Sequence, residues 1–379
     1  MALSTTRKIA FALVVPIVTA LTLGAGTELY LRRTRSHIIA LKRTPLRQRL
    51  GIAEQDAALI VRHTDRGRRI VPGAEVLIKN HYLSHIDIPF VVNSLGFRGE
   101  EIPLHKTEGV PRVLMLGDSI TQADYLLDED TWVRQTQRRL EHMLDHPVET
   151  LNSGVGDTGS QEQLDILEET GLRVKPDVVV LGFYLNDSRP TWGFPGEVSG
   201  RNWLRRNSLL VDNLYEKLIF RQWIERQGAE RFSWVQAQNR LDWKHNRADF
   251  LKLARLAQYD WGAAWNDESW KEIDAELTRL ADDARRNGFR VATLTFPVSF
   301  QVNAIEPDVT PQRTFAALAK KHGFSNLDLL PLYRAHSSEK ILFDQCHPTA
   351  VMNRLIGEAV APFLFEDVKW AAAAHSPIE

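Results

Sequence analysis

Three residue types that can cooperate in hydroxyl chemistry stand far apart in this chain. Ser119 ends the tripeptide Gly117-Asp118-Ser119, directly after the apolar stretch RVLML (112–116). Near the C-terminus, FDQCHP places Asp344 three residues before His347. A serine is a weak nucleophile until a general base takes its proton, and imidazole titrates near neutrality. In a turn, Asp344 can hold one ring nitrogen and leave the other facing the serine. The sequence predicts Ser119 as nucleophile, His347 as base and Asp344 as its partner.

An oxyanion formed by this serine needs donors that are already in place. The candidates are the backbone N–H of Ser119, a glycine N–H from NSGVGDTGS (152–160), and the side-chain amide of Asn186. Gly156 and Gly154 both remain open as the glycine donor. We expect Asp118 to brace the turn, and we expect the single cysteine, Cys346, to be a buried small hydrophobic residue.

The Gly154-x-Gly156-x-x-Gly159 run also has the spacing of a dinucleotide-binding loop. That interpretation needs an acid at the end of the next strand, about 20 residues on, and Asp177 and Asp187 both fit poorly. Metal-binding cysteine frameworks are excluded because the chain has one cysteine.

These polar clusters follow apolar segments that the sequence predicts as strands, or lie in the late loop before the last helix. The alternation of segments predicts an open, three-layer α/β sheet, and ligands bind such sheets outside the carboxyl ends of the strands. The predicted strands are 112–116, 148–152, 177–184 and 289–298, with a further apolar segment at 326–333. The predicted helices are 128–144 (N-cap Asp130), 160–172 (opened by Ser160), 269–288, 311–322 and 349–364.

The set of motifs resembles the SGNH hydrolases, also called GDSL esterases. In that family the blocks carry a serine in Gly-Asp-Ser, a glycine, an asparagine and an Asp-x-x-His pair. The resemblance assigns Ser119 as nucleophile, Asn186 to the oxyanion hole, and Asp344 and His347 as the closing pair. It covers about 110–366 and implies a flavodoxin-like three-layer fold with ester or acyl hydrolysis that needs no metal or organic cofactor. The glycine block is one residue short of the usual spacing from Asn152, and Gly182 does not correspond to the glycine of the asparagine block.

A helical, tryptophan-rich insertion is predicted at about 190–285, inside a hydrolase-like domain that spans 111–369. Residues 190–270 hold eight of the ten tryptophans and no clear strand. Aromatic residues at helical spacing are usually core, although these could also line a substrate groove. A small β lead-in segment (71–110) precedes the domain, and a tail (370–379) follows it.

The N-terminus contains IAFALVVPIVTALTLGAGT (9–27), which carries no charge and is long enough to cross a bilayer as a helix. We expect an uncleaved single-pass anchor over 1–30, followed by a basic juxtamembrane linker over 31–70, rather than a cleaved signal peptide. The basic residues after the helix favour a cytoplasmic domain by the positive-inside rule, whereas large domains behind such anchors are more often exported. We favour the exported side.

Lys and Arg total 47 against 48 Asp and Glu, so no basic field marks a nucleic-acid binder. The sequence predicts a membrane-anchored serine esterase that acts on an O-acetyl glycan or a lipid acyl ester. Two alternatives stay open, an acyltransferase with the same triad and a non-catalytic scaffold or binding protein that retains the fold.

Overall fold

A computed structural model describes residues 5–41, 60–189 and 202–374 of the chain. Residues 42–59 of the expected linker, 190–201 of the expected insertion and the last five residues of the expected tail lie outside the described residues.

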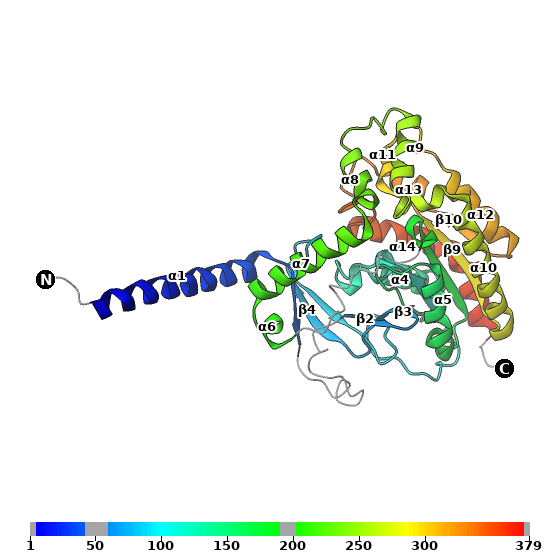
Figure 1. The fold of residues 1–379 in the computed structure, drawn as a ribbon. Coiled ribbons are helices and arrows are strands. Elements are labelled where there is room, and N and C mark those ends of the chain that lie inside the picture. Colours follow the sequence, from blue (N-terminus) through cyan, green and yellow to red (C-terminus); the bar gives the residue numbers. More distant parts are fainter. Residues whose placement is uncertain (1–4, 42–59, 190–201, 375–379) are drawn as a thin grey trace.

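The centre of the molecule is a five-stranded parallel sheet with the strand order β10-β9-β8-β6-β7 (Figure 1). Numbered along the chain, this order is 2-1-3-4-5, which is the flavodoxin-like arrangement. Both β6 and β8 are buried along their whole length, as expected for strands covered on two faces. The predicted three-layer α/β fold is confirmed. The strands are β6 (Arg112–Gly117), β7 (Glu149–Asn152), β8 (Val178–Tyr184), β9 (Arg290–Phe296) and β10 (Ser325–Asp328).

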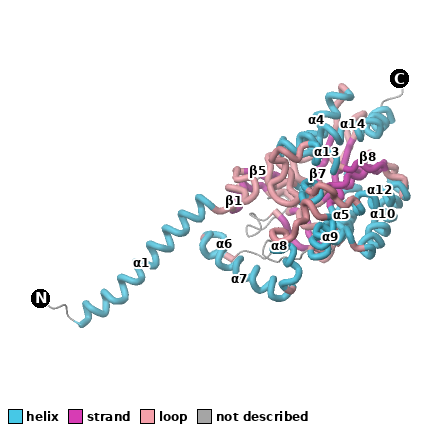
Figure 2. Tube along the Cα trace, turned by 90° about the horizontal axis from the view of Figure 1, so that it is seen from above, coloured by secondary structure: helices cyan, strands magenta, loops and turns pink. Residues whose placement is uncertain are grey.

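Helices cover the two faces of this sheet (Figure 2). One layer consists of α4 and α14, which pack against each other, and the other contains α10 between α5 and α12. Short helices α3, α11 and α13 follow strand ends. The bounds are α3 (Ser119–Gln122), α4 (Trp132–Leu144), α5 (Ser160–Glu169), α10 (Asp267–Asn287), α11 (Ser299–Asn303), α12 (Thr310–Lys321), α13 (Leu330–Ala335) and α14 (Ala350–Ala374).

Several predicted helix ends were wrong. The helix predicted at 160–172 ends at Glu169, and a separate 3-10 turn follows at Gly171–Val174. Residues Asp128–Asp130 form a 3-10 turn, so α4 is capped by Thr131, whose hydroxyl accepts the Arg134 N–H at 3.3 Å, and not by Asp130. The N-cap of α5 is Gly159 rather than Ser160, and the Glu162 carboxylate accepts the Gly159 N–H at 3.2 Å. The final helix continues past residue 364 to Ala374, where Val368 and Ala371 are still buried.

Before the central sheet, the chain forms small antiparallel β units. One sheet has the order β1-β4-β5, and β2 and β3 form a separate hairpin. Strands β4 and β5 occupy the predicted lead-in segment, whereas β1, β2 and β3 lie within 31–70, where the sequence analysis predicted no strand. The bounds are β1 (His37–Ala40), β2 (Val61–Thr64), β3 (Gly67–Ile70), β4 (Glu75–Lys79) and β5 (Ile88–Val91).

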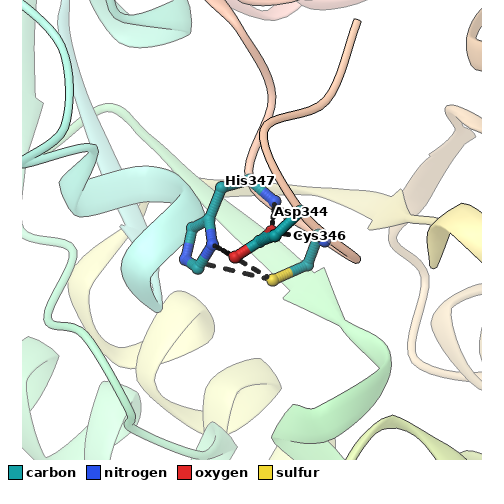
Figure 3. A group of neighbouring side chains, drawn as sticks. All are labelled: Asp344, Cys346 and His347. Carbon is teal, nitrogen blue, oxygen red and sulfur yellow. Dashed lines mark hydrogen bonds and ion pairs between the residues drawn. The ribbon is translucent and has the colours of Figure 1, made fainter. Parts of the chain in front are cut away.

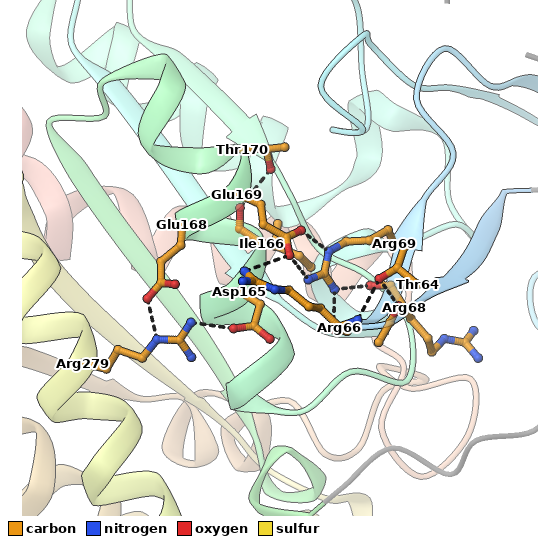
Figure 4. A network of polar contacts seen from close by, with 11 residues as sticks. Thr64, Arg66, Arg68, Arg69, Asp165, Ile166, Glu168, Glu169, Thr170 and Arg279 are labelled. Atoms are coloured by element: carbon orange, nitrogen blue, oxygen red, sulfur yellow. Dashed lines mark hydrogen bonds and ion pairs between the residues drawn. The ribbon is translucent and has the colours of Figure 1, made fainter. Parts of the chain in front are cut away.

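Ion pairs fasten the β2–β3 hairpin to the central domain (Figure 4). The Arg69 guanidinium donates to both carboxylate oxygens of Glu169 on α5, at 2.8 and 3.1 Å. On the neighbouring side of the same helix, Arg279 of α10 donates to Asp165 and Glu168, each at 2.5 Å. Bidentate arginine–carboxylate pairs fix geometry as well as charge. The β2–β3 hairpin is therefore held against α5 of the central domain.

The described part of the insertion is helical, with its tryptophans packed mainly as core. Trp261 is fully buried and stacks on Phe300 with a centroid distance of 5.0 Å, and Trp234 lies edge-on to both rings. This packing favours a compact helical subdomain over an aromatic groove; Trp203 is an exposed exception. The elements are α6 (Trp203–Asn207), α7 (Leu209–Gln227), α8 (Ser233–Ala237), α9 (Arg247–Leu256) and the 3-10 helix η7 (Trp261–Trp265).

The N-terminal helix α1 (Thr5–Thr34) projects away from the rest of the molecule (Figures 1 and 2). Its stretch Val14–Thr34 is long and apolar enough to cross a membrane, with a mean hydropathy of 1.5, and little of it is buried within the protein. Among the described residues it is the one helix with these properties.

Candidate active site

Ser119 is the first residue of α3, directly beyond the carboxyl end of β6. The Asp118 carboxylate caps this helix by accepting the Ile120 N–H at 2.9 Å, which is the bracing role expected for it. Gly117 makes the tight turn possible, because a Cβ there would lie 2.1 Å from the Thr121 hydroxyl and 3.1 Å from the Gly182 carbonyl. The serine is thus presented at the edge of the sheet on a rigid turn.

A chain of hydrogen bonds joins the three residues expected to form the triad. The Ser119 hydroxyl lies 2.9 Å from Nε2 of His347, and Nδ1 of His347 lies 2.8 Å from Oδ2 of Asp344. The other oxygen of Asp344 accepts the backbone N–H groups of Cys346 and His347, both at 2.9 Å. These bonds form a tight turn in which the carboxylate lies against the imidazole (Figure 3). Residues 228 positions apart in the sequence meet at hydrogen-bonding distance.

The surroundings of His347 raise its pKa, and those of Asp344 lower its pKa. Burial would lower the pKa of His347, but the hydrogen bond and charge of Asp344, with the charges of Asp118 and Asp124, hold it above the ordinary value of 6.5. Burial would raise the pKa of Asp344, but the hydrogen bond and charge of His347 and the two backbone N–H donors lower it. Asp344 is therefore a carboxylate that stabilises a protonated His347.

Two more acids are buried near the serine. Burial raises the pKa of Asp118 to about 6. Burial and the charge of Asp118 raise the pKa of Asp187 well above its ordinary value, and Asp187 accepts the Tyr184 N–H at 3.0 Å. Asp187 lies in the 3-10 helix η4 (Leu185–Ser188), so its role in the geometry is to shape the turn that carries Asn186.

Asn186 follows β8, whose Gly182 is paired in register with Gly117 of β6. The strand pairing therefore puts Asn186 and Ser119 beyond neighbouring strand ends. Within the described part of the chain, the Asn186 side chain has no hydrogen-bond partner, and its Oδ1 is buried. An unpaired amide at this edge is available for a ligand.

The two candidate glycines have different surroundings. A Cβ on Gly156 would lie 3.6 Å from the Ser119 Cβ, so Gly156 borders the nucleophile. A Cβ on Gly154 would lie 2.4 Å from the backbone nitrogen of Gln122, so this buried glycine allows two backbone segments to approach closely. The geometry favours Gly156 over Gly154 as the donor candidate.

Sequence reasoning missed Gln122, the last residue of α3. Its Oε1 accepts the Gly156 N–H at 2.7 Å, whereas its Nε2 is buried and unpartnered among the described residues. In this conformation the Gly156 N–H is already used, whereas no described residue accepts a hydrogen bond from the Ser119 N–H or from the Asn186 side-chain amide. No motif marks Gln122, because its partner is a backbone N–H 34 residues away.

Sequence reasoning also missed Arg98, from the lead-in segment, which holds the far end of α3. Its buried guanidinium donates to the carbonyls of Gln122 at 2.8 Å and Leu126 at 2.7 Å, and also to the Ala123 carbonyl. The last carbonyls of a helix lack hydrogen-bond donors within the helix, and the Arg98 guanidinium provides these donors. Tyr125, in the loop so fixed, lies edge-on to the His347 ring with centroids 5.0 Å apart. The lead-in segment thereby holds α3, which begins with Ser119, and the loop whose Tyr125 packs against His347.

Asp344, Cys346 and His347 each offer a metal-ligand atom within 4.8 Å of the others. The chemistry of this set fits a triad better than a metal centre. Burial, with the charge of Asp344, raises the pKa of the Cys346 thiol well above its ordinary value, so the sulfur stays protonated and is a poor ligand. Both ring nitrogens of His347 already have partners in Asp344 and Ser119.

No protein-family model matches the chain, and no curated protein matches its sequence. Several solved structures have limited similarity to it. A two-domain esterase active on acetylated mannans aligns at 13% identity over 69% of this chain and 50% of its own, with a TM-score of 0.41. An acetyl xylan esterase, AlAXEase, aligns at 15% identity over 67% and 99%, with a TM-score of 0.38. A putative lipolytic protein of the G-D-S-L family from Desulfitobacterium hafniense aligns at 13% identity over 66% and 98%, with a TM-score of 0.37.

The geometry of the chain itself defines the class of site. A serine, a histidine and an aspartate are joined by hydrogen bonds at the carboxyl edge of a flavodoxin-type parallel sheet. This arrangement is the one that activates a serine hydroxyl for attack on a carbonyl group.

Proposed function

We propose that this protein is a serine esterase of the SGNH type that hydrolyses an ester through an acyl-enzyme. The observation that carries the proposal is the hydrogen-bond chain from Ser119 through His347 to Asp344, with both bonds shorter than 3 Å. Such a chain supplies a nucleophile, a base and an orienting carboxylate without further groups.

In the proposed reaction, Ser119 Oγ attacks the ester carbonyl carbon while His347 Nε2 takes the hydroxyl proton. Asp344 holds the Nδ1–H and stabilises the imidazolium. The carbonyl oxygen becomes an oxyanion that accepts the Ser119 N–H and the Asn186 amide, and Gly156 adds its N–H if Gln122 releases it. His347 then protonates the departing alcohol. A water molecule attacks the acyl-enzyme by the same steps in reverse, which releases the acid and restores Ser119.

A labelling experiment tests the nucleophile. We expect a fluorophosphonate probe to label the parent protein and not Ser119→Ala, and we expect this variant to lose p-nitrophenyl acetate hydrolysis by at least about 10³-fold. Ser325→Ala, at an exposed serine that opens β10 at the amino edge of the sheet and not at the edge that carries Ser119, is the matched control and should behave like the parent. Absence of labelling in the parent would overturn the proposal in favour of a non-catalytic role.

The substrate class within this proposal is an O-acetyl group on a glycan or an acyl ester of a lipid. A panel of p-nitrophenyl esters of increasing chain length separates the two: an acetyl preference supports the glycan, and activity that rises with chain length supports the lipid. Release of free acid, measured against transfer to added alcohols, separates hydrolysis from acyl transfer.

We also propose that α1 is a single-pass anchor and that the catalytic domain lies on the exported side. The charge-free run at 9–27 and the exposed apolar surface of α1 support the anchor. A reporter fused to the C-terminus, with activity only outside the cytoplasm, tests the side.

A further inference from the structure

An apolar stripe lies exposed on the first half of α7. Val211, Leu214, Tyr215 and Leu218 follow the spacing i, i+3, i+4, i+7, which places them on one face of a helix. Leu214 is 60% exposed and Leu218 is 54% exposed. Apolar residues at this spacing normally face a partner that excludes water.

The stripe continues onto α6, the short helix before α7. Trp203 is 67% exposed and Leu204 is 55% exposed. The two helices are fixed to each other, because the buried Arg205 guanidinium donates to Asp212 at 2.8 Å and lies over the Tyr215 ring at 4.0 Å. We call Trp203, Leu204, Val211, Leu214, Tyr215 and Leu218 the apolar ledge.

The apolar ledge begins at the base of α1. Glu28 of α1 accepts the N–H groups of Leu209 at 3.0 Å and Leu210 at 2.9 Å, and the Ser208 hydroxyl at 3.0 Å. Arg32 donates to the carbonyl of Asn207 at 3.0 Å. The start of α7 is therefore held beside the first charged residue that follows the charge-free run of α1, and Figures 1 and 2 show α6 and α7 next to that end of α1.

The same face of α7 becomes polar farther from α1. Arg221, Gln222 and Glu225 continue the helical face after Leu218 and are all exposed, and Arg221 pairs with Glu225 at 3.0 Å. A stripe that is apolar near α1 and charged away from it matches a surface whose surroundings change from lipid to water along its length.

We propose that the apolar ledge lies in the interfacial layer of the same bilayer that α1 crosses. Exposed tryptophan and leucine side chains enter the boundary between headgroups and acyl chains, where indole rings are favoured. Arg33, Arg35 and Lys217, which are exposed near the same end, face anionic headgroups. The inference rests on the proposed anchor, and it gives the described helical insertion a role in fixing the domain against the lipid surface.

Fluorescence of single labels in the full chain tests this placement. The buried Cys346 is first replaced by alanine, and one cysteine is added for an NBD label at Leu214, Leu218, Val14 or Ile305. Val14 on α1 is the membrane control. Ile305, which is 61% exposed, is the water control; it follows α11, which Figure 1 shows far from α1. The protein is reconstituted in vesicles of phosphatidylcholine and phosphatidylglycerol.

We expect the emission of the labels at Leu214 and Leu218 to be blue-shifted relative to that of the label at Ile305. Lipids with doxyl groups near the headgroup should quench these two labels at least twofold more than the Ile305 label. Iodide in the water should quench only the Ile305 label strongly. One outcome would overturn the membrane placement of the ledge but not the anchor. In that outcome, iodide quenches the Leu214 and Leu218 labels as strongly as the Ile305 label, while the doxyl lipids still quench the Val14 label. Protection from both quenchers would show that protein covers the ledge and would also overturn it.

A Val14 label that iodide reaches would overturn the anchor and the ledge together. Hydrolysis of p-nitrophenyl acetate by the parent protein in equivalent vesicles is scored separately, so that failure of the esterase proposal is distinguished from failure of the membrane proposals.

Discussion

At the scale of single residues, the charge of Asp344 controls the protonation of His347. The base must be neutral to accept the serine proton, so activity falls as the pH falls through the pKa of His347. Because that pKa lies above 6.5, we expect the acidic limb of the kcat/KM profile to have its midpoint above 6.5.

The matched variant is Asp344→Asn. The substitution removes the hydrogen bond and charge of the carboxylate, both of which raise the pKa of His347, so the midpoint should move to lower pH. The maximal rate should fall by on the order of 10³-fold or more, because the imidazole loses its orienting partner. A midpoint that stays in place would contradict the assigned role of Asp344.

Asn186 offers a second prediction at this scale. We expect Asn186→Ala to lower kcat by about 10²–10³-fold with a small change in KM, as for the loss of one donor to an oxyanion. Initial rates on p-nitrophenyl acetate measure this, and Asn303→Ala, at an exposed asparagine of α11, is the control. A rise in KM with constant kcat would assign Asn186 to substrate binding instead.

At the scale of elements, Arg98 connects the lead-in segment to α3. Arg98→Met leaves three carbonyls without their donor, and we expect the free energy of unfolding to fall by about 3 kcal/mol. Denaturant titration measures the loss. Arg98→Lys should restore little of it, because an ammonium cannot reach the carbonyls with the fork of a guanidinium. Full stability in the lysine variant would count against this account.

Alanine substitutions at Gly154 and Gly156 test whether the two glycines differ in how closely the backbone surrounds them. An alanine at Gly154 would collide with the backbone of Thr121 and Gln122, whereas an alanine at Gly156 meets chiefly the movable end of the Gln122 side chain. We expect Gly154→Ala to lower the unfolding free energy by about 1–3 kcal/mol and Gly156→Ala to change it little. Equal stability losses, measured by thermal unfolding, would show that the two positions do not differ in this way.

Local patterns sufficed to predict the elements that carry the triad. The apolar runs at 112–116 and 177–184 identify strands buried on both faces, and each is followed by the polar residues of the site. The strands β2 and β3 escaped prediction because they are short and mix charged with apolar residues, as in His63 and Arg68. Strand β1 escaped because it has four residues and lies in a basic segment. Arg98 and Gln122 escaped because each binds backbone groups that only the folded chain brings near.

At the scale of the whole molecule, Glu28 joins the anchor helix to the insertion. We expect Glu28→Ala to speed amide hydrogen exchange at the start of α7, since Leu209 and Leu210 lose their acceptor, while hydrolysis of a soluble ester stays unchanged. Glu28→Gln keeps one acceptor oxygen and should give an intermediate rate. Unchanged exchange in the alanine variant would show that other contacts hold this end of α7.

The last long helix has a consequence for biosynthesis. His347 stands just before α14, and α14 is fixed by its packing on α4 and by Asn353, whose side chain accepts the Trp132 N–H at 2.8 Å. A ribosome therefore completes Ser119 long before it makes the segment that positions the base. For the function proposed above, the nascent polypeptide therefore stays inactive until α14 has emerged and packed on α4.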